Sequence, residues 1–422
     1  MFPYFRRSEH FHDANGNATQ HGFDGPIFTA PIDREHPLRL PVRKAFLDVG
    51  FNNNADADDG YPIGIAAWIE NWHNAVRQPA GVAYDLSSVQ VMAGCQAHRV
   101  FLSDTTEGKT ATGVELIDGR QFRATKEVII SCGALRTPQV LILSGIGPTD
   151  VTSSLKITQH VNSPSVGQHL HDHCSLVQFW KLKNPELGIA MGAPDFFSNY
   201  PKFLEGMPVN WIITGTVPTA ELQTGLLIDV ESIDGENQHP QIKVPQAHTE
   251  FTVACSLLGM PRPGYELSTD GTHISSGVVN LLPISRGTVK LAASNPQDDP
   301  LIDPNHFATN TDKCIIRAGV RRMMQVMETP AMKNFIDGEA VPAGGVPLTS
   351  TSSDEEIDDR VRQFANTWYH PAGMAAMGKV VDSELRVMVF KGCVLLMQVL
   401  CLLPFLLISK HVFTLWRNKL QI

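Results

Sequence analysis

The chain has 422 residues, too many for one ordinary domain, and this length indicates roughly two or three. Hydrophobic residues make up 43% and charged residues 18%, a balance that excludes global disorder. The 34 basic and 43 acidic residues give a net charge of -9, and no basic run stands out along the chain. A nucleic-acid or anionic-membrane partner therefore has little support.

The cysteines and the two ends of the chain bear on whether the protein is disulfide-rich, zinc-binding, secreted or anchored in a membrane. Seven widely spaced cysteines without a C-x-x-C pair argue against a disulfide framework or a structural zinc cluster. The first residues lack the apolar segment of a secretory signal, so the cytosol is the default expectation. Residues 393–408 form an almost unbroken apolar run, but it is shorter than the roughly 20 residues that a membrane helix needs. A tail anchor is therefore not favoured.

The N-terminal third is predicted to contain loops and then a β-meander. Residues 1–79 are rich in Asn, Asp, Gly and Pro, which predicts loops around short helices. Short β-type runs follow at residues 89–92, 99–102 and 113–117. The dipeptide Asp-Gly at 118–119 predicts the turn of a hairpin after them.

A strand, a glycine turn and a helix are predicted next. The strand covers residues 126–131 and leads into Gly133 and Ala134. The helix is expected to have Thr137 as its N-cap, with a proline at its first position, and to end at Gly145. This order is typical of one half of a nucleotide-binding α/β unit.

The second half of the chain is predicted to be a mixed domain followed by two helices. Residues 175–289 combine aromatic and β-branched runs, which favours an antiparallel sheet. Thr311 is expected to cap the first helix, whose methionines are interpreted as core filler. A capping box from Ser353 to Glu356 begins the second helix, which is expected to end near Asn366.

Three histidines at alternate positions form one candidate site. His169, His171 and His173 would share one face of a strand, and such a cluster suits zinc or iron. No other part of the chain repeats a ligand pattern. The alternative is a polar loop in which Asp172 and His173 hydrogen-bond to each other and to the backbone.

His370 is the second candidate, because it lies in a loop directly after a helix, where catalytic side chains are often mounted. Taken alone, one of 16 histidines is more often a surface residue or a structural residue with satisfied hydrogen bonds. The sequence contains no G-x-S-x-G, Walker or H-E-x-x-H motif, which removes the usual hydrolase, NTPase and metalloprotease readings.

These features together resemble the glucose-methanol-choline (GMC) family of flavin-dependent oxidoreductases. Residues 133–147, Gly-Ala-Leu-Arg-Thr-Pro-Gln-Val-Leu-Ile-Leu-Ser-Gly-Ile-Gly, look like the second signature of that family. Further similar stretches lie in the family's order along about residues 1–387, and the texture is closest to fungal members. They are residues 2–9, 166–173, 285–289, 299–304 and 370–378.

The resemblance implies a mixed α/β (α+β) fold, with an incomplete Rossmann-like domain that binds FAD and a substrate domain with an antiparallel sheet. It divides the chain into four consecutive segments. These are 1–174 as the partial FAD-binding region, 175–345 as the substrate domain, 346–387 as the region of the catalytic histidine, and 388–422 as an atypical apolar tail.

The resemblance also implies a reaction and a catalytic residue. His370 would take the hydroxyl proton of a small-molecule primary or secondary alcohol while hydride passes to flavin N5. A neutral imidazole is a suitable base near pH 7. The texture of the sequence suggests fungal secondary metabolism.

The expected cofactor contacts also follow from the resemblance. Gly133 and Ala134 would form the turn beside FAD, and the backbone of Ala97 would meet the adenine. Asp172 and His173 would lie in the flavin-attachment region, so the three histidines are interpreted as that loop and no metal is expected.

Gly373 and Met374 complete the expected cofactor contacts. Met374 replaces a usual Thr and His169 replaces a usual Asn, so a hydroxyl contact is expected to be lost while backbone contacts remain.

Two departures from the family qualify this interpretation. The sequence has no G-x-G-x-x-G, and similarity stops after Val387, before the segment of a second catalytic residue. The chain is therefore expected to be truncated at its start and divergent at its end. The alternative hypothesis is a non-catalytic remnant of a GMC protein that does not bind FAD.

Overall fold

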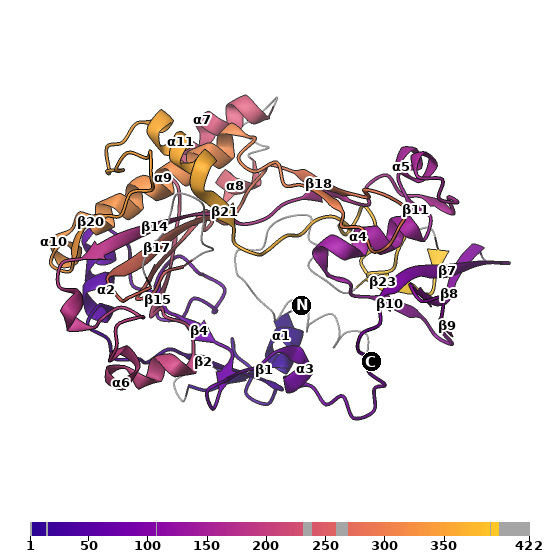
Figure 1. Cartoon of the computed structure of the whole chain (residues 1–422), viewed down its shortest axis with the longest axis horizontal. Helices are drawn as coiled ribbons and strands as arrows, with labels where there is room; N and C mark the ends of the chain where they lie inside the picture. The colour runs from indigo at the N-terminus through magenta and orange to yellow at the C-terminus, as the bar shows by residue number, and fades with distance from the viewer. Residues whose placement is uncertain are drawn as a thin grey trace. The chain divides into compact units, whose positions relative to one another are not determined.

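The computed structural model describes residues 2–13, 16–106, 108–230, 239–258, 269–388 and 390–395. The chain divides into two compact units, each made of three separate segments, which can be followed by colour in Figure 1. Unit 1 holds Met1–Asp85, Cys174–Leu282 and Thr309–Trp368, and unit 2 holds Leu86–His173, Pro283–Ala308 and Tyr369–Ile422. The division into four consecutive segments stays a prediction.

An antiparallel sheet forms the centre of unit 1. Seven strands of the described residues build it in the order β20-β14-β17-β16-β15-β3, with β21 beside β14. Its strands are β3 (Gly64–Ala67), β14 (Cys174–Leu182), β15 (Trp211–Gly215), β16 (Thr249–Ala254), β17 (His273–Asn280), β20 (Ile336–Glu339) and β21 (Ala365–Thr367). The antiparallel sheet expected for this part of the chain is confirmed.

Helices α9 (Asn310–Met327) and α2 (Arg39–Asp48) pack against this sheet (Figure 1). Gly319 of α9 allows a close approach, because an added Cβ would lie 2.6 Å from Cγ1 of Val278 in β17. Phe46 of α2 packs against Phe251 of β16, with ring centroids 5.9 Å apart. The other helical segments of unit 1 are α1 (Phe2–Ser8), α3 (Ala80–Ala83), η1 (Pro185–Leu187), α6 (Phe196–Asn199), η2 (Pro201–Glu205), α7 (Thr219–Asp229), α8 (Pro240–Lys243), α10 (Pro330–Lys333) and α11 (Asp354–Phe364).

The N-terminal segment contains strands that the sequence did not predict. They are β1 (Glu9–Phe11), β2 (Ile27–Pro31), β4 (Ile69–Glu70), β5 (Trp72–His73) and β6 (Val76–Arg77), besides β3. Each has only two to five residues, and β1 pairs in parallel with β2 across a long connection. Strands this short carry almost no periodic pattern, and most of them are determined by pairing with distant segments, whereas β5 and β6 form a local hairpin.

The N-termini of α9 and α11 differ in how well the local sequence predicts them. The capping box of Ser353 and Glu356 at the start of α11 is confirmed. The N-cap of α9 is Thr309, two residues before the predicted Thr311. Thr311 is instead buried, and its hydroxyl donates to Asp229 of α7 at 2.7 Å. The side chains of Thr309 and Thr311 are both able to cap a helix. Because Asp229 of α7 binds the hydroxyl of Thr311, Thr309 is the residue that caps α9.

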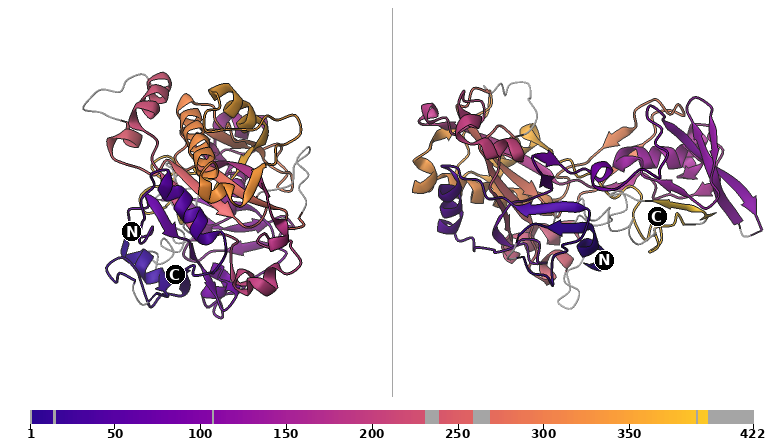
Figure 2. Two further views of the ribbon diagram at one scale, coloured as in Figure 1. Left: turned by 90° about the vertical axis from the view of Figure 1, so that its left-hand side faces the viewer. Right: turned by 90° about the horizontal axis from the view of Figure 1, so that it is seen from below.

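In unit 2 the predicted meander is an antiparallel hairpin, which projects in the right-hand view of Figure 2. It consists of β7 (Ala97–Thr105) and β8 (Gly108–Leu116), with β9 (Gln121–Arg123) and β22 (Phe390–Lys391) also paired to β8. The turn at residues 118–119 is confirmed, with Gly119 at a φ of 86°. Residues 89–92 form no strand, and Val89 and Val91 are exposed. That part of the prediction was wrong because an apolar run without a buried face gains nothing from an extended conformation.

Helix α4 (Gly133–Leu143) follows β10 (Val128–Ile130), which pairs in parallel with β23 (Cys393–Leu395). The helix begins five residues before the predicted start, and Thr137 lies buried inside it instead of capping it. Its apolar residues are buried in the core of unit 2, and this packing compensates for a proline inside the helix. The predicted end at Gly145, with a φ of 74°, is confirmed.

The remaining elements of unit 2 complete its core. They are β11 (Ile146–Gly147), α5 (Thr149–Ser154), β12 (Val161–Asn162), β13 (Gln168–Leu170), β18 (Gly287–Lys290) and β19 (Leu301–Asp303).

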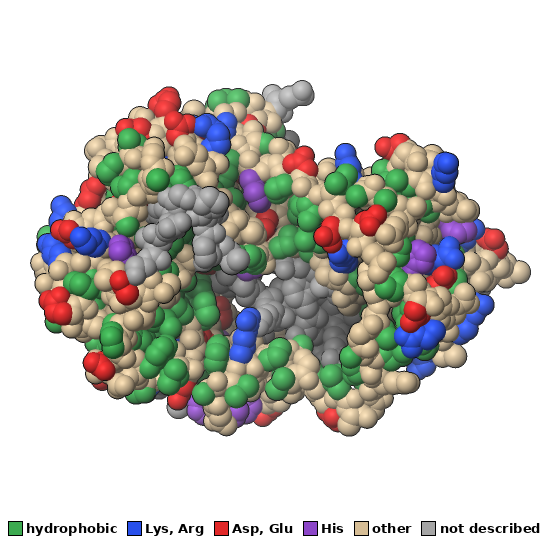
Figure 3. All heavy atoms as spheres, viewed as in Figure 1, with side chains coloured by type: hydrophobic (Ala, Val, Ile, Leu, Met, Phe, Trp, Pro, Cys, Tyr) green, Lys and Arg blue, Asp and Glu red, His purple; other side chains and the backbone are tan. Residues whose placement is uncertain are grey.

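The surface and the apolar tail bear on the expected partners. On the face seen in Figure 3, basic and acidic side chains of the described residues are interspersed in small groups. In the part of the chain that the structure describes, no helix is long and apolar enough to cross a membrane. Of the apolar run at residues 393–408, β23 is described and the rest lies outside the described residues.

Candidate active site

Two segments of unit 2 that are distant in sequence are joined at the candidate site. The backbone N–H of His171 donates to the carbonyl of Ala372 at 3.0 Å, and the N–H of Ala372 donates back at 2.8 Å. The N–H of Gly167 donates to the carbonyl of Met374 at 2.8 Å. These bonds hold residues 166–173 beside residues 370–374.

Gly373 makes this close approach possible. Its φ of 96° is one that side chains rarely adopt, and an added Cβ would lie 2.1 Å from the carbonyl oxygen of His169. The same Cβ would lie 2.8 Å from Nδ1 of His171. A glycine is therefore required where the two segments meet.

His370 is held by the dipeptide formed by Asp172 and His173. The backbone N–H of His370 donates to Oδ1 of Asp172 at 2.9 Å, and Nδ1 of its ring lies 3.2 Å from Nδ1 of His173. Burial lowers the pKa of His370 to about 4. Its imidazole is therefore neutral near pH 7 and is able to accept a proton.

His171 lies next to this group and is almost completely buried, with 3% of its surface exposed. Because a carbonyl only accepts, the 3.2 Å contact with the carbonyl of His169 means that Nδ1 of His171 donates. Burial, followed by the charge of Arg286, lowers the pKa of His171 to about 3. Its Nε2 has no hydrogen-bond partner among the described residues, so a buried acceptor atom remains. The sequence singled out His171 as one of three alternate histidines, but it gave no signal that this side chain would be buried.

The three alternate histidines do not behave as a strand. His169 has a φ of 67°, and β13 is irregular at this point, so the alternation that would place the rings on one face is broken. His171 and His173 are buried, whereas His169 is partly exposed. Within the described residues, no group of three or more His, Cys, Asp or Glu side chains is arranged to hold a metal ion. The expectation that the protein needs no metal stays a prediction.

The predicted cofactor residues Gly133 and Ala134 lie in the first turn of α4. Gly133 has a φ of 84°, and apart from its chain neighbours and the backbone of its own helix no atom of the described residues lies within 4 Å of the position that its Cβ would occupy. The N-cap residue Cys132 makes no capping hydrogen bond with its side chain. A helix N-terminus with open space beside its backbone suits the phosphate or carbonyl oxygens of a bound flavin nucleotide. These residues therefore fit FAD.

Met374 and Ala97 lie in different surroundings. Met374 is fully buried in the core of unit 2 together with apolar residues of α4, so its backbone carbonyl, and not its side chain, takes part in joining the two segments. Ala97 is the first residue of β7 and pairs with Leu116 of β8. It belongs to the hairpin and not to the histidine group.

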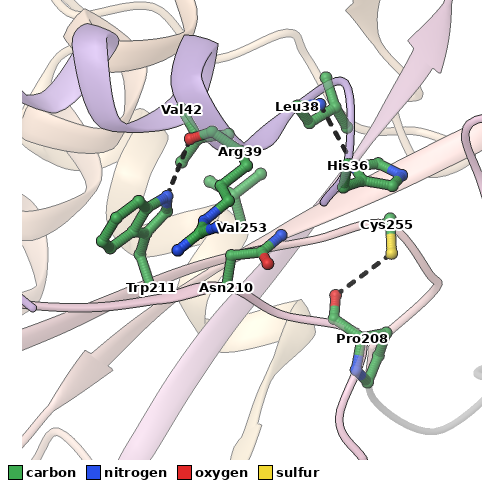
Figure 4. Close-up of a pocket in the computed structure, with 9 residues that line it drawn as sticks. All are labelled: His36, Leu38, Arg39, Val42, Pro208, Asn210, Trp211, Val253 and Cys255. Atoms are coloured by element: carbon green, nitrogen blue, oxygen red, sulfur yellow. Dashed lines mark hydrogen bonds between the residues drawn. The ribbon is translucent and has the colours of Figure 1, made fainter. Parts of the chain in front are cut away.

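A small pocket in unit 1 is another place where a base or a nucleophile was sought (Figure 4). His36 there uses both ring nitrogens, since Nδ1 accepts from the N–H of Leu38 at 3.2 Å and Nε2 donates to the carbonyl of Ile189 at 3.0 Å. Burial raises the pKa of Cys255 to about 12, so its thiol is not a nucleophile near pH 7. The residues that line the pocket are His36, Leu38, Arg39, Val42, Pro208, Asn210, Trp211, Val253 and Cys255. The pocket provides neither a base nor a nucleophile.

Comparisons with known proteins agree with the sequence resemblance. Two family models, both described as GMC oxidoreductase, match residues 34–175 and 283–394. The chain is 44% identical over 361 residues to the GMC-type oxidoreductase acuG of Aspergillus aculeatus, an alignment that covers 86% of this chain and 68% of that protein. It is 27% identical over 409 residues to an alcohol dehydrogenase (acceptor) of Pseudomonas putida, which covers 92% of this chain and 68% of that protein.

The fold is also found among solved structures. The formate oxidase of Aspergillus oryzae RIB40 matches with a TM-score of 0.86 at 23% identity, over 99% of this chain and 76% of that chain. This likeness confirms the expected fold class.

Proposed function

Because this chain belongs to the family of GMC oxidoreductases, which are flavin-dependent and use FAD, we propose that it oxidises a small-molecule alcohol with His370 as the base. The observation that carries this proposal is the environment of His370. Its ring is kept neutral by burial, and its backbone is anchored to Asp172.

The residues around His370 divide the work of the reaction. The first turn of α4, with Gly133 and Ala134, would hold the cofactor through its backbone. Asp172 and Gly373 fix the path of the chain on both sides of His370. The side chain of His370 then receives the hydroxyl proton of the substrate.

The proton and the electron pair leave the alcohol in different directions. The O–H proton goes to the imidazole of His370, which becomes an imidazolium. FAD, held through the backbone of Gly133 and Ala134, would supply the two-electron acceptor for the hydride of the carbinol carbon, so that the alcohol is converted to an aldehyde or ketone. A neutral base is required because an alcohol gives up hydride readily only as its alkoxide develops.

The class of substrate follows from the chemistry and from the relatives. A primary or secondary alcohol is required, since the oxidised carbon must carry both a hydroxyl group and a hydrogen atom. The relative from Pseudomonas putida carries the name alcohol dehydrogenase, which supports this class. The proposed role in fungal secondary metabolism rests on the composition and motifs of the sequence, and the similarity to a protein of Aspergillus aculeatus supports the fungal type alone.

Reduction of the flavin by candidate alcohols tests the proposal. The protein with its FAD is mixed anaerobically with a panel of alcohols, and bleaching of the flavin absorbance is followed. His370→Ala is expected to slow the reduction by about 10²- to 10⁴-fold, the usual contribution of a general base. The control is His160→Ala, because His160 is exposed in the same unit and lies outside the site.

Two results would overturn the proposal. One is reduction by an alcohol at the same rate in the wild type and in His370→Ala. The other is a chain that folds and yet retains no FAD, which would favour the alternative of a non-catalytic remnant.

A further inference from the structure

The contact between His173 and His370 constrains where the protons of the pair lie. The two Nδ1 atoms are 3.2 Å apart, within hydrogen-bond distance, and the ring planes meet at 73°. One Nδ1 must carry a hydrogen and the other must present a lone pair. When both rings are neutral, each ring has one protonated and one unprotonated nitrogen.

Only one of the two arrangements leaves a base on His370. If His173 donates, Nδ1 of His370 is the acceptor, and the proton of His370 lies on Nε2, which then has no lone pair for a substrate. If His370 donates, its Nε2 keeps the lone pair, and Nδ1 of His173 is the acceptor. The second arrangement is the one that allows general-base chemistry at Nε2.

We propose that His173 is a positioning residue, which accepts the Nδ1–H of His370 and so presents the lone pair of His370 Nε2 to the substrate. This inference rests on the proposed function, in which His370 is the base. His173 is suited to the role because only 5% of its surface is exposed, and the β-bridge at His171 fixes the segment that carries it. The neighbouring Asp172 holds the backbone of His370, so one dipeptide controls both the position and the tautomer of the base.

The same contact supports the charge that develops during the reaction. When Nε2 of His370 takes a proton, its Nδ1–H becomes a charged donor, and the hydrogen bond to His173 becomes stronger. This favours the imidazolium and opposes the effect of burial. Asp172 lies at the backbone of His370, and His171, two residues before His173, is subject to the charge of Arg286.

The tautomer of His370 can be measured without turnover. In NMR spectra of protein whose histidine rings carry labelled nitrogen, His370 is assigned by the signal lost in His370→Gln. The wild type is expected to show a hydrogen on Nδ1 of His370. His173→Leu is expected to lose this preference, and His173→Asn to retain it, because its amide oxygen replaces the acceptor.

The pH profile of kcat/KM provides the second readout. Loss of an acceptor that favours the imidazolium lowers the pKa of His370, so the acid limb of His173→Leu is expected to move to lower pH while kcat falls roughly 10- to 100-fold. His173→Asn is expected to restore both. A purely structural role would reduce the folded fraction without moving the limb.

The outcomes separate this inference from the function on which it rests. Undiminished turnover in His370→Ala overturns the proposed function. Turnover that depends on His370, together with an unchanged tautomer and acid limb in His173→Leu, overturns the positioning role alone. A wild-type His370 with its hydrogen on Nε2 also overturns it.

Discussion

Oδ1 of Asp172 accepts the backbone N–H of His370 at 2.9 Å, across 198 positions of the sequence. The carboxylate thereby fixes the position of the His370 backbone, from which the imidazole projects. Because the bond goes to the backbone N–H, it does not occupy either nitrogen of the imidazole. Replacing this acceptor therefore tests the position of the base and not its chemistry.

We expect Asp172→Ala to lower the rate of flavin reduction about 10- to 100-fold, since displacing a catalytic group by about 1 Å has effects of this size. Asp172→Asn keeps an oxygen at the same position, so its rate should stay within a few-fold of wild type. Stopped-flow measurement of both variants decides. Equal losses in the two variants would show that the charge of Asp172, and not its acceptor geometry, matters.

Gly373→Ala is expected to disturb the site and the fold together. The added methyl group would strike the carbonyl oxygen of His169, and the backbone would keep an unfavourable positive φ. Gly378 provides the matched control, since its φ of 76° is also positive but the space beside it is open. Gly378→Ala should cost only the backbone strain of about 1–2 kcal/mol. Thermal unfolding should show a clearly larger loss for Gly373→Ala, and equal losses would refute the close-approach argument.

A buried ion cluster in unit 1 predicts a pH dependence of stability. Nδ1 of His21 contacts Glu9 at 3.0 Å, and Nε2 contacts Asp56 at 2.7 Å. Burial opposes the charge of His21, but hydrogen bonds to Asp56 and Glu9 outweigh it and raise the pKa of His21 to about 10. His21 therefore contributes its full stability below its unfolded pKa of 6.5, and this contribution is lost as the pH rises toward 10.

Glu9 and Asp56, the acidic partners of His21, make the stability of the protein depend on pH at the acidic end of the range. The same hydrogen bonds outweigh burial and lower the pKa values of Glu9 and Asp56, so their contribution is lost as the pH falls. His21→Gln should cost about 3–5 kcal/mol near pH 6, the usual effect of breaking a buried ion pair, and less near pH 10. Urea unfolding at several pH values measures this. The control is His10→Gln on the exposed side of β1, and a pH-independent loss for His21→Gln would contradict the prediction.

Glu250 of β16 should destabilise the protein at neutral pH. Its side chain is completely buried, and within the described residues neither carboxyl oxygen has a hydrogen bond of ordinary geometry, although the Trp368 side chain interacts with it weakly. Burial raises its pKa to about 7, and the nearby Trp368 indole opposes this only in part. Since the unfolded pKa is 4.5, the penalty is absent at pH 4, grows between pH 4.5 and 7, and is then constant.

Glu250→Gln is therefore expected to stabilise the protein by about 1–3 kcal/mol above pH 7 and to have little effect at pH 4. Unfolding by urea at both pH values provides the comparison. Glu186→Gln, at an exposed position, should change neither value. A loss of stability at pH 8 in Glu250→Gln would mean that the carboxylate has a partner that stabilises its charge.

Some elements were predictable because their signals lie within one turn of helix or one hairpin. The capping box at Ser353 and the glycine at position 119 act on residues two to four positions away, and both were placed correctly. The start of α4 was not, because Thr137 has the chemistry of an N-cap but is buried by packing inside unit 2. The short strands β1–β4 depend on partners that are distant in sequence, whereas β5 and β6 pair with each other but are too short to show a pattern.

The sequence by itself determined the family, the antiparallel sheet and His370 as the candidate base, because motifs and hydrophobic patterns are local properties of the chain. It did not determine that His370 would meet Asp172 and His173, nor that His169 would break the row of three histidines. Those features depend on contacts across 197 and 198 positions and on a left-handed backbone at His169. Burial, which makes His370 neutral, arises only when the chain is folded, so the protonation of the site belongs to the tertiary structure.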